Sequence, residues 1–153
     1  MNSAHAGFAP TAFLMFLTGI GIPILATFNA QLGQQLTSPV AATFVLFAVG
    51  FILSAIVLVA TGGFPDASRF TMDRPYLYFA AAFMLAYVLS ITWAAPRIGI
   101  GNAVFFVLLG QLIAAALIDH FGLWGAMVTT LTPRRLVGIA VMALGVYLAR
   151  KPV

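Results

Sequence analysis

Charged side chains interrupt this sequence at only a few places, and the apolar stretches between them constrain the fold more than any other feature. No Asp, Glu, Lys or Arg occurs before Asp66. The chain of 153 residues is 63% hydrophobic and 7% charged, with a mean hydropathy of +1.10. A water-soluble domain of this length and composition would aggregate. The sequence therefore predicts an all-α integral membrane protein. At about 20 residues per span it has room for about five transmembrane helices and no separate soluble domain.

Turn and capping residues place the ends of these helices within a single transmembrane domain. Pro23 is expected to kink the first helix. The third is expected to stop at Pro96, since proline disfavours helix in the residue before it. Thr132 and Pro133 suit the cap and first turn of a last helix. Residues 121–131, apolar but rich in glycine, are interpreted as an interfacial or re-entrant stretch. The predicted spans are approximately residues 10–36, 40–61, 75–95, 99–118 and 133–149.

The basic residues divide almost evenly between the two sides of a five-span protein. An excess of Lys and Arg in the short loops of one side normally sets orientation. The two groups are Arg69, Arg74, Arg134 and Arg135 on one side, and Arg97, Arg150 and Lys151 on the other. Four against three leaves orientation undecided, so we expect both orientations and an antiparallel homodimer.

Several classes of function are excluded or disfavoured by what the sequence lacks. The basic residues flank apolar segments, where they anchor in lipid headgroups, so the expected partner is the lipid bilayer and not nucleic acid. Cysteine is absent, which excludes disulfides and thiolate metal sites. No His, Ser or carboxylate cluster approaches catalytic or metal-binding spacing, so we expect no enzyme activity, metal or cofactor. Residues 1–9 contain no Lys or Arg, so the first apolar segment is expected to be a retained helix.

Polar side chains inside apolar spans are costly, which makes them the candidates for a substrate pathway. Asn29 and Gln31 face roughly opposite sides of a helix; Asn29 shares a face with Gly33 and suits close packing or solute contact, while Gln31 suits hydration. Gln111 lies deepest in its span, and its alternative role is an interhelical hydrogen bond. Tyr87 and Trp93, both aromatic, suit a solute pocket or, alternatively, packing and an interfacial belt. The six pathway candidates are Asn29, Gln31, Tyr87, Ser90, Trp93 and Gln111.

Asp119 is the only carboxylate within reach of a span. It could couple proton movement to transport, or pair with Arg134 or Arg135 at headgroup level, and the ion pair is the preferred interpretation. Glu is absent, and no carboxylate lies deep in any span. Exchange of organic cations for protons is therefore disfavoured, and a neutral, zwitterionic or anionic solute suits the available groups better.

Two segments carry a family resemblance. Residues 110–125, GQLIAAALIDHFGLWG, and residues 131–138, LTPRRLVG, resemble the YdcZ-type inner-membrane exporters, as does the early segment from Asn29 to Gly50. The resemblance implies a short five-helix member of the drug/metabolite transporter superfamily, multi-pass in the bacterial inner membrane. It implies a secondary transporter that exports a small organic solute. We expect alternating access in a dual-topology dimer.

Two alternatives share the same scaffold. One is a dimeric passive channel, for which steady single-molecule conductance would be expected in place of saturable exchange. The other is a subunit that requires an oppositely oriented homologous partner.

Overall fold

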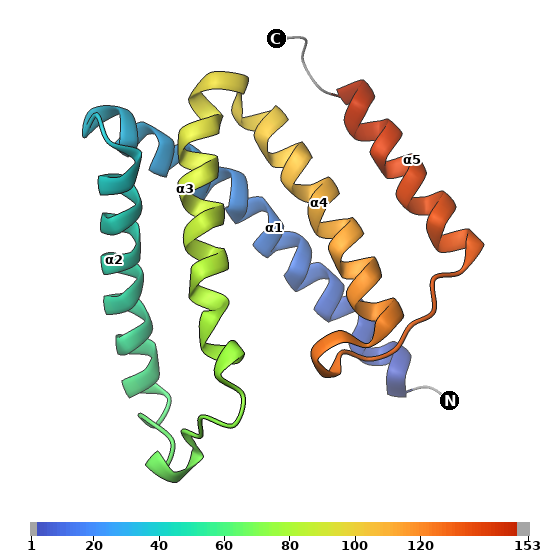
Figure 1. Cartoon of the computed structure of the whole chain (residues 1–153), viewed down its shortest axis with the longest axis horizontal. Coiled ribbons are helices and arrows are strands. Elements are labelled where there is room, and N and C mark those ends of the chain that lie inside the picture. Colours follow the sequence, from blue (N-terminus) through green and yellow to red (C-terminus); the bar gives the residue numbers. More distant parts are fainter. Residues whose placement is uncertain (1–2, 150–153) are drawn as a thin grey trace. The chain divides into compact units, whose positions relative to one another are not determined.

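The computed structural model describes the backbone of residues 3–149 and the side chains of residues 8–149. Over that range it contains five α-helices and three short 3-10 helices (Figure 1). Arg150 and Lys151, which entered the orientation count, lie outside the described residues. The chain divides into two compact units, Met1–Pro96 and Arg97–Val153, and each is described by itself.

Three helices build the first unit. They are α1 (Ser3–Gln35), α2 (Pro39–Ala60) and α3 (Ala80–Ile98), and the connection before α3 holds the 3-10 helices η1 (Ala67–Arg69) and η2 (Pro75–Phe79). The turn between α1 and α2 is short because Ser38 caps α2: its hydroxyl accepts from the Ala41 N–H at 3.1 Å, and Pro39 fills the first helical position.

The ends of α3 differ from those expected from the sequence. Residues 75–79 form a 3-10 helix, so the α-helix begins only at Ala80. At the other end α3 continues through Pro96 to Ile98. It ends before Gly99, whose φ of +84° is disfavoured for residues with a side chain. The helix limit is therefore this glycine and not the proline.

The core of the first unit consists mainly of small side chains. Ala26, Ala30 and Gly33 lie on one face of α1, at the i, i+4, i+7 spacing of a helix. A Cβ on Gly33 would lie 3.1 Å from Thr92 Cγ2 and 3.7 Å from Ala42 Cβ, so the three helices meet closely at this glycine. Such close approach through small residues is typical of helix packing in membranes. The other buried residues are Asn29, Ala42, Thr43, Val88, Ile91, Thr92 and Ala95.

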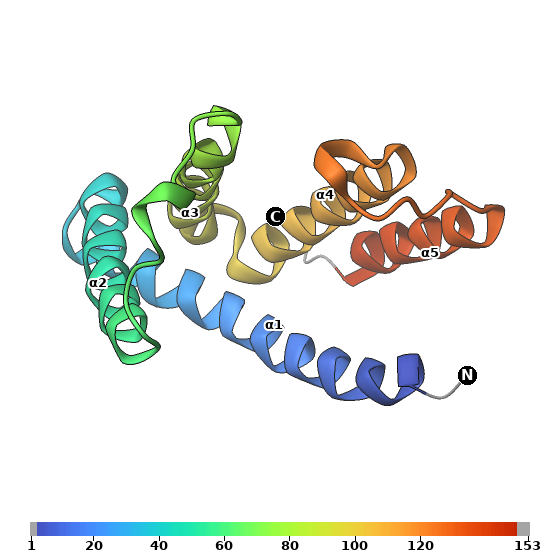
Figure 2. The same cartoon turned by 90° about the horizontal axis from the view of Figure 1, so that it is seen from below.

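The second unit is a pair of helices. These are α4 (Ile100–Phe121) and α5 (Pro133–Ala149), which lie side by side in both views (Figures 1 and 2). Residues 121–131, expected to be an interfacial or re-entrant stretch, begin with the last residue of α4, contain the 3-10 helix η3 (Leu123–Gly125) and continue without regular secondary structure. Gly122 ends α4 in the left-handed conformation and donates its N–H to the Ile118 carbonyl.

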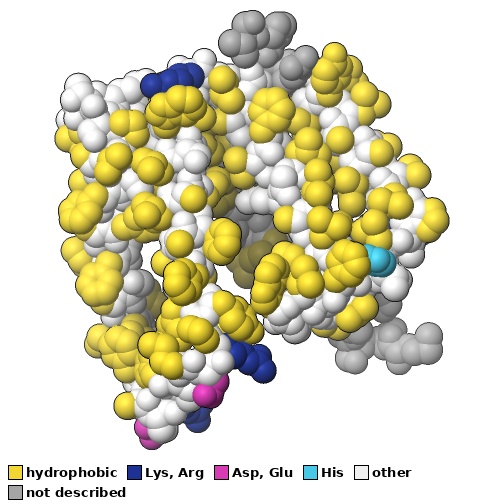
Figure 3. Space-filling model, in the orientation of Figure 1, with side chains coloured by type: hydrophobic (Ala, Val, Ile, Leu, Met, Phe, Trp, Pro, Cys, Tyr) yellow, Lys and Arg dark blue, Asp and Glu magenta, His cyan; other side chains and the backbone are white. Residues whose placement is uncertain are grey.

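Within the described part of the chain, four helical segments are long and apolar enough to cross a membrane: Phe8–Gln35, Pro39–Ala60, Pro75–Ile98 and Ile100–Phe121. At about 1.5 Å per residue, the 17 residues of α5 span about 26 Å, short of a hydrocarbon core of about 30 Å. Apolar side chains cover the face seen in Figure 3, and charged side chains lie at helix ends and connections. The expected all-helical membrane protein is confirmed, with four helices of spanning length where five were expected. Its single domain stays a prediction.

Candidate functional site

Asn29 is the most deeply buried of the six pathway candidates, with 4% of its surface exposed. Its Nδ2 donates a hydrogen bond of 2.6 Å to the Thr92 Oγ1, which links α1 to α3. The Thr92 hydroxyl in turn donates to the Val88 carbonyl at 2.7 Å. Together these contacts form a polar chain inside a core of small apolar side chains.

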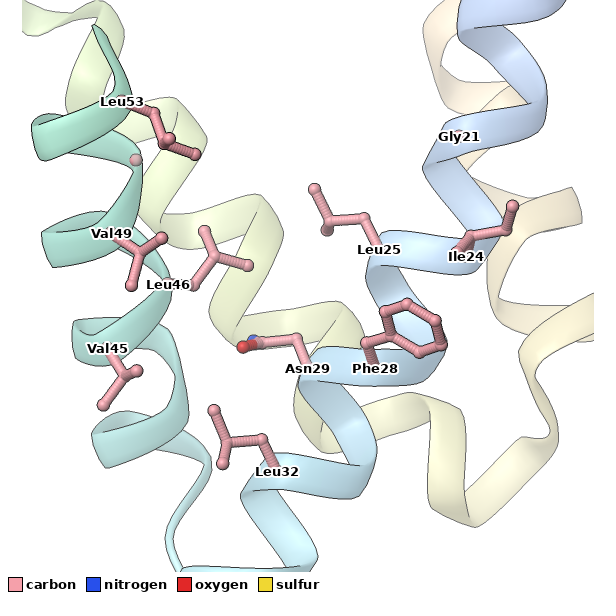
Figure 4. A pocket seen from close by; sticks show the side chains of 11 residues that line it. Gly21, Ile24, Leu25, Phe28, Asn29, Leu32, Val45, Leu46, Val49 and Leu53 are labelled. Atoms are coloured by element: carbon pink, nitrogen blue, oxygen red, sulfur yellow. The ribbon is translucent and has the colours of Figure 1, made fainter. Parts of the chain in front are cut away.

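This polar chain determines which way the Asn29 amide faces. A threonine hydroxyl has a single hydrogen, and that of Thr92 is directed at the Val88 carbonyl. Its oxygen can then only accept from Asn29, so the NH₂ group faces Thr92 and the carbonyl oxygen faces elsewhere. Figure 4 shows this oxygen, Oδ1, pointing from α1 toward α2.

Oδ1 faces a groove between α1 and α2, with a volume of about 650 Å³. This volume lies within the range of small-molecule sites. Leu25 and Leu32 flank Asn29 on α1, and Leu46 and Leu53 project from α2 (Figure 4). Among the described residues that line the groove, Asn29 alone has a polar side chain. The groove-lining residues are Gly21, Ile24, Leu25, Phe28, Asn29, Leu32, Val45, Leu46, Val49, Gly50 and Leu53.

The groove follows from where α1 and α2 can pack. Near the turn Gly33 allows contact, since a Cβ there would lie 3.5 Å from Pro39 Cα. Away from the turn the two helices diverge (Figure 1). Gly21 and Gly50 line this wider part, and a Cβ on either would meet nothing within 4 Å. The groove is therefore open space beside a closely packed end.

The remaining pathway candidates are not gathered around Asn29. Gln31, Ser90 and Gln111 are exposed, and Trp93 is 53% exposed. The contrast between buried Asn29 and exposed Gln31 agrees with their placement on opposite sides of α1. Tyr87 is different: its Oη is buried and, among the described residues, has no hydrogen-bond partner.

Thr92 is the site residue that sequence reasoning did not single out. The hydroxyl of a threonine within a helix usually donates a hydrogen bond to the carbonyl four residues earlier, as Thr92 does to Val88. Such a threonine is therefore not an obvious functional candidate from sequence. A signal was nevertheless present in the spacing. Val88, Thr92 and Ala95 repeat at i, i+4 and i+7, which matches the small-residue face of α1.

Asp119 and Arg135 belong to a second polar cluster, at the connection between α4 and α5. Arg135 Nη2 lies 2.6 Å from Asp119 Oδ2, and both side chains are about one-third exposed. Arg135 Nη1 also donates to the Thr129 carbonyl at 3.4 Å, and the Thr129 N–H donates to the Asp119 carbonyl at 2.9 Å. Arg134 is exposed and makes no ion pair with a described residue.

His120 completes this cluster. Its Nδ1 accepts a hydrogen bond of 3.1 Å from the Leu131 N–H, so in this geometry Nδ1 carries no proton. The Thr132 hydroxyl then caps α5 by accepting from the Arg135 N–H at 3.3 Å. The cluster holds the connection between α4 and α5 against the end of α4. Its polar groups bond to other groups of the chain.

Among the described residues, no group of three or more His, Cys, Asp or Glu side chains could hold a metal ion.

Residues 10–148 match the protein family described as "Putative inner membrane exporter, YdcZ". No curated protein and no solved structure matches the chain. The match covers nearly the whole sequence, so the chain belongs to this exporter family. Its helices and its family together identify an integral membrane protein, and the family description favours a transporter over an enzyme.

Proposed function

We propose that this member of the exporter family is a secondary transporter, which carries a small organic solute out across the bacterial inner membrane. Membership of an exporter family supports the direction and the location. The observation that carries the proposal is Asn29, a buried polar side chain at an apolar groove of small-molecule size, between two helices long enough to span a membrane. Polar groups at such positions commonly mark the path of a solute.

The proposed active unit is an antiparallel homodimer that alternates between inward-open and outward-open shapes, and we place it in the drug/metabolite transporter superfamily. With α5 as a fifth crossing, the basic residues divide four against three, and this near-even distribution supports dual orientation. Large apolar side chains such as Phe44, 72% exposed, and Phe51, 73% exposed, support a surface that contacts lipid or a second chain. In an antiparallel pair the two access states can be related by symmetry, so one bound solute could be released on either side.

The proposed solute is not an organic cation. Asp66 and Asp73 lie in the connection between α2 and α3, and Asp119 is paired with Arg135. No carboxylate therefore lines the groove at Asn29, which is where a cation would need one. The ion pair also supports a structural role for Asp119 in place of proton coupling.

The orientation can be tested because the chain lacks cysteine. A single Cys added after Lys151 is labelled with an impermeant thiol reagent in intact and in permeabilised cells. Labelling of about half the molecules from outside is expected for dual orientation. Labelling from one side only would remove the symmetric dimer.

Export itself is tested by comparing the solutes released by bacterial cells that make the protein with those released by cells that make no copy of it. The expected result is a small organic solute enriched in the medium of the first culture, with saturable flux in vesicles that contain the purified protein. Steady current through single molecules would identify a channel instead.

A further inference from the structure

We propose that the groove between α1 and α2 binds a neutral, largely apolar molecule that donates a hydrogen bond, from an N–H or O–H group, to Asn29 Oδ1. This inference rests on the proposed function and names the chemical class of its solute. It follows from the direction of one buried amide, the composition of the groove and the volume of the groove.

The first step is the orientation of the amide. Thr92 accepts from Asn29 Nδ2 at 2.6 Å, and its own hydrogen is used by the Val88 carbonyl. A flipped amide would place Oδ1 against Thr92 Oγ1, where two acceptors would meet unless the hydroxyl left Val88. The groove is therefore presented with an acceptor. A ligand that can only accept hydrogen bonds has no partner there.

The second step is that Oδ1 lacks a donor among the described residues. Asn29 as a whole residue is 96% buried, and no described donor reaches its Oδ1, although this oxygen is not fully enclosed and stays accessible from the groove. A carbonyl oxygen without a partner at an apolar groove costs free energy, which a donor from outside the chain would recover. A ligand with a suitably placed N–H or O–H is thus favoured over one of the same shape without it.

The third step concerns charge and size. The ten described groove-lining residues other than Asn29 have apolar or no side chains, so none of them can pair with a charged group of a ligand. A volume of about 650 Å³ suits a small organic molecule. A lipid acyl chain could fill the same space, but it has no donor for Oδ1. A neutral solute with one donor satisfies all three features.

The test uses two probes of nearly the same shape, indole, which has an N–H donor, and indene, which has a CH₂ group in its place. Binding to the purified full-length protein in detergent is measured by calorimetry, with empty micelles as the blank. Indole is expected to bind at least tenfold more tightly than indene, which corresponds to about 1.4 kcal/mol. Equal affinities would overturn the inference.

Variants at Asn29 separate the hydrogen bond from simple apolar binding. The double variant Asn29→Leu/Thr92→Val removes both partners of the polar chain together, so that no buried donor is left unpaired. Its affinity for indole is expected to fall to that for indene. Persistence of a tenfold preference for indole would show that the donor binds elsewhere, and would overturn the inference.

A second pair of variants tests occupancy of the groove without altering Asn29. Gly21 lines the groove and Gly19 does not, and a Cβ on either meets nothing within 4 Å. Gly21→Leu is expected to weaken indole binding at least tenfold, whereas Gly19→Leu, the matched control, leaves it unchanged. Equal effects of the two variants would overturn the inference. The inference would also be overturned if Gly21→Leu, but not Gly19→Leu, dissociated a dimer while indole binding was unchanged, because a second copy of the chain would then be the occupant of the groove.

Failure of these binding tests would leave the proposed function testable. The labelling and export experiments use neither indole nor the groove variants. Loss of the indole preference together with dual orientation and solute export would reject the ligand class and keep the transporter. The reverse outcome, a tenfold indole preference without any export, would keep the site and reject the transporter.

Discussion

Replacing Thr92 by valine is expected to destabilise the protein, although it changes the side-chain volume little. The hydroxyl accepts from Asn29 Nδ2 at 2.6 Å and is fully buried, with 1% of Thr92 exposed. Thr92→Val leaves the Asn29 NH₂ group without this acceptor, and a buried donor without a partner costs about 1–3 kcal/mol. Hydrogen bonds between membrane helices average nearer 0.6 kcal/mol and reach about 1.7 kcal/mol. We therefore expect a loss of about 1–2 kcal/mol in the free energy of unfolding.

The assay is reversible unfolding of the purified protein in mixed micelles, followed by far-ultraviolet circular dichroism as the denaturing detergent increases. A double-mutant cycle with Asn29→Leu separates the hydrogen bond from the rest of the change. The two substitutions are expected to be non-additive by about 1 kcal/mol, because the double variant leaves no orphaned donor. Thr92→Ser, which keeps the hydroxyl, is the control. Additive effects within about 0.3 kcal/mol would refute the reasoning.

Three further predictions concern packing and the connection between α4 and α5. Gly33→Leu should destabilise the first unit by about 1–3 kcal/mol, because even a Cβ would lie 3.1 Å from a neighbouring side chain. Gly19→Leu, which lies in open space, should change the free energy of unfolding by less than about 0.5 kcal/mol in the same assay. Asp119→Asn should lower stability by less than about 1 kcal/mol, since the ion pair is one-third exposed. It should nevertheless raise the rate of amide hydrogen exchange at residues 121–132. Unchanged exchange there would show that the ion pair does not hold the connection. In His120→Asn the new Oδ1 can replace Nδ1 as the acceptor for the Leu131 N–H, so slow hydrogen exchange at that amide should be retained. His120→Phe provides no acceptor and should lose the slow exchange. Equal protection in both variants would contradict the hydrogen bond as the cause of slow exchange.

The positions of the helices could be predicted from hydropathy alone, because each apolar stretch must satisfy its backbone hydrogen bonds internally once it lies in lipid. The predictions were less accurate where local backbone geometry decides. The sequence placed the end of the third span at Pro96, but a proline in a last turn removes only one donor, and Gly99 with its positive φ ends the helix. The short length of α5 likewise leaves its membrane crossing a prediction.

The candidate site divides in the same way. Asn29 was identifiable because an amide inside an apolar span is rare and costly, and its shared face with Gly33 indicated close packing. The sequence did not show whether Arg134 or Arg135 pairs with Asp119. Adjacent residues at a helix start point in different directions, and only the path of the connection decides which of them reaches the carboxylate. Dimerisation and dual orientation rest on the count of basic residues and stay predictions.

Composition and periodicity, then, are sufficient to predict a helical membrane protein and to select Asn29 as a candidate, because these depend on single residues and their spacing along one helix. The family follows from short sequence motifs and the family match over residues 10–148. The partner of Asn29 lies 63 positions away in the chain. Which hydroxyl meets the amide, and hence that an acceptor oxygen is left facing a groove of about 650 Å³, depends on how α1, α2 and α3 cross in space. Hydropathy contains no information on that crossing, because it is decided by the contact of small side chains from different helices around Gly33.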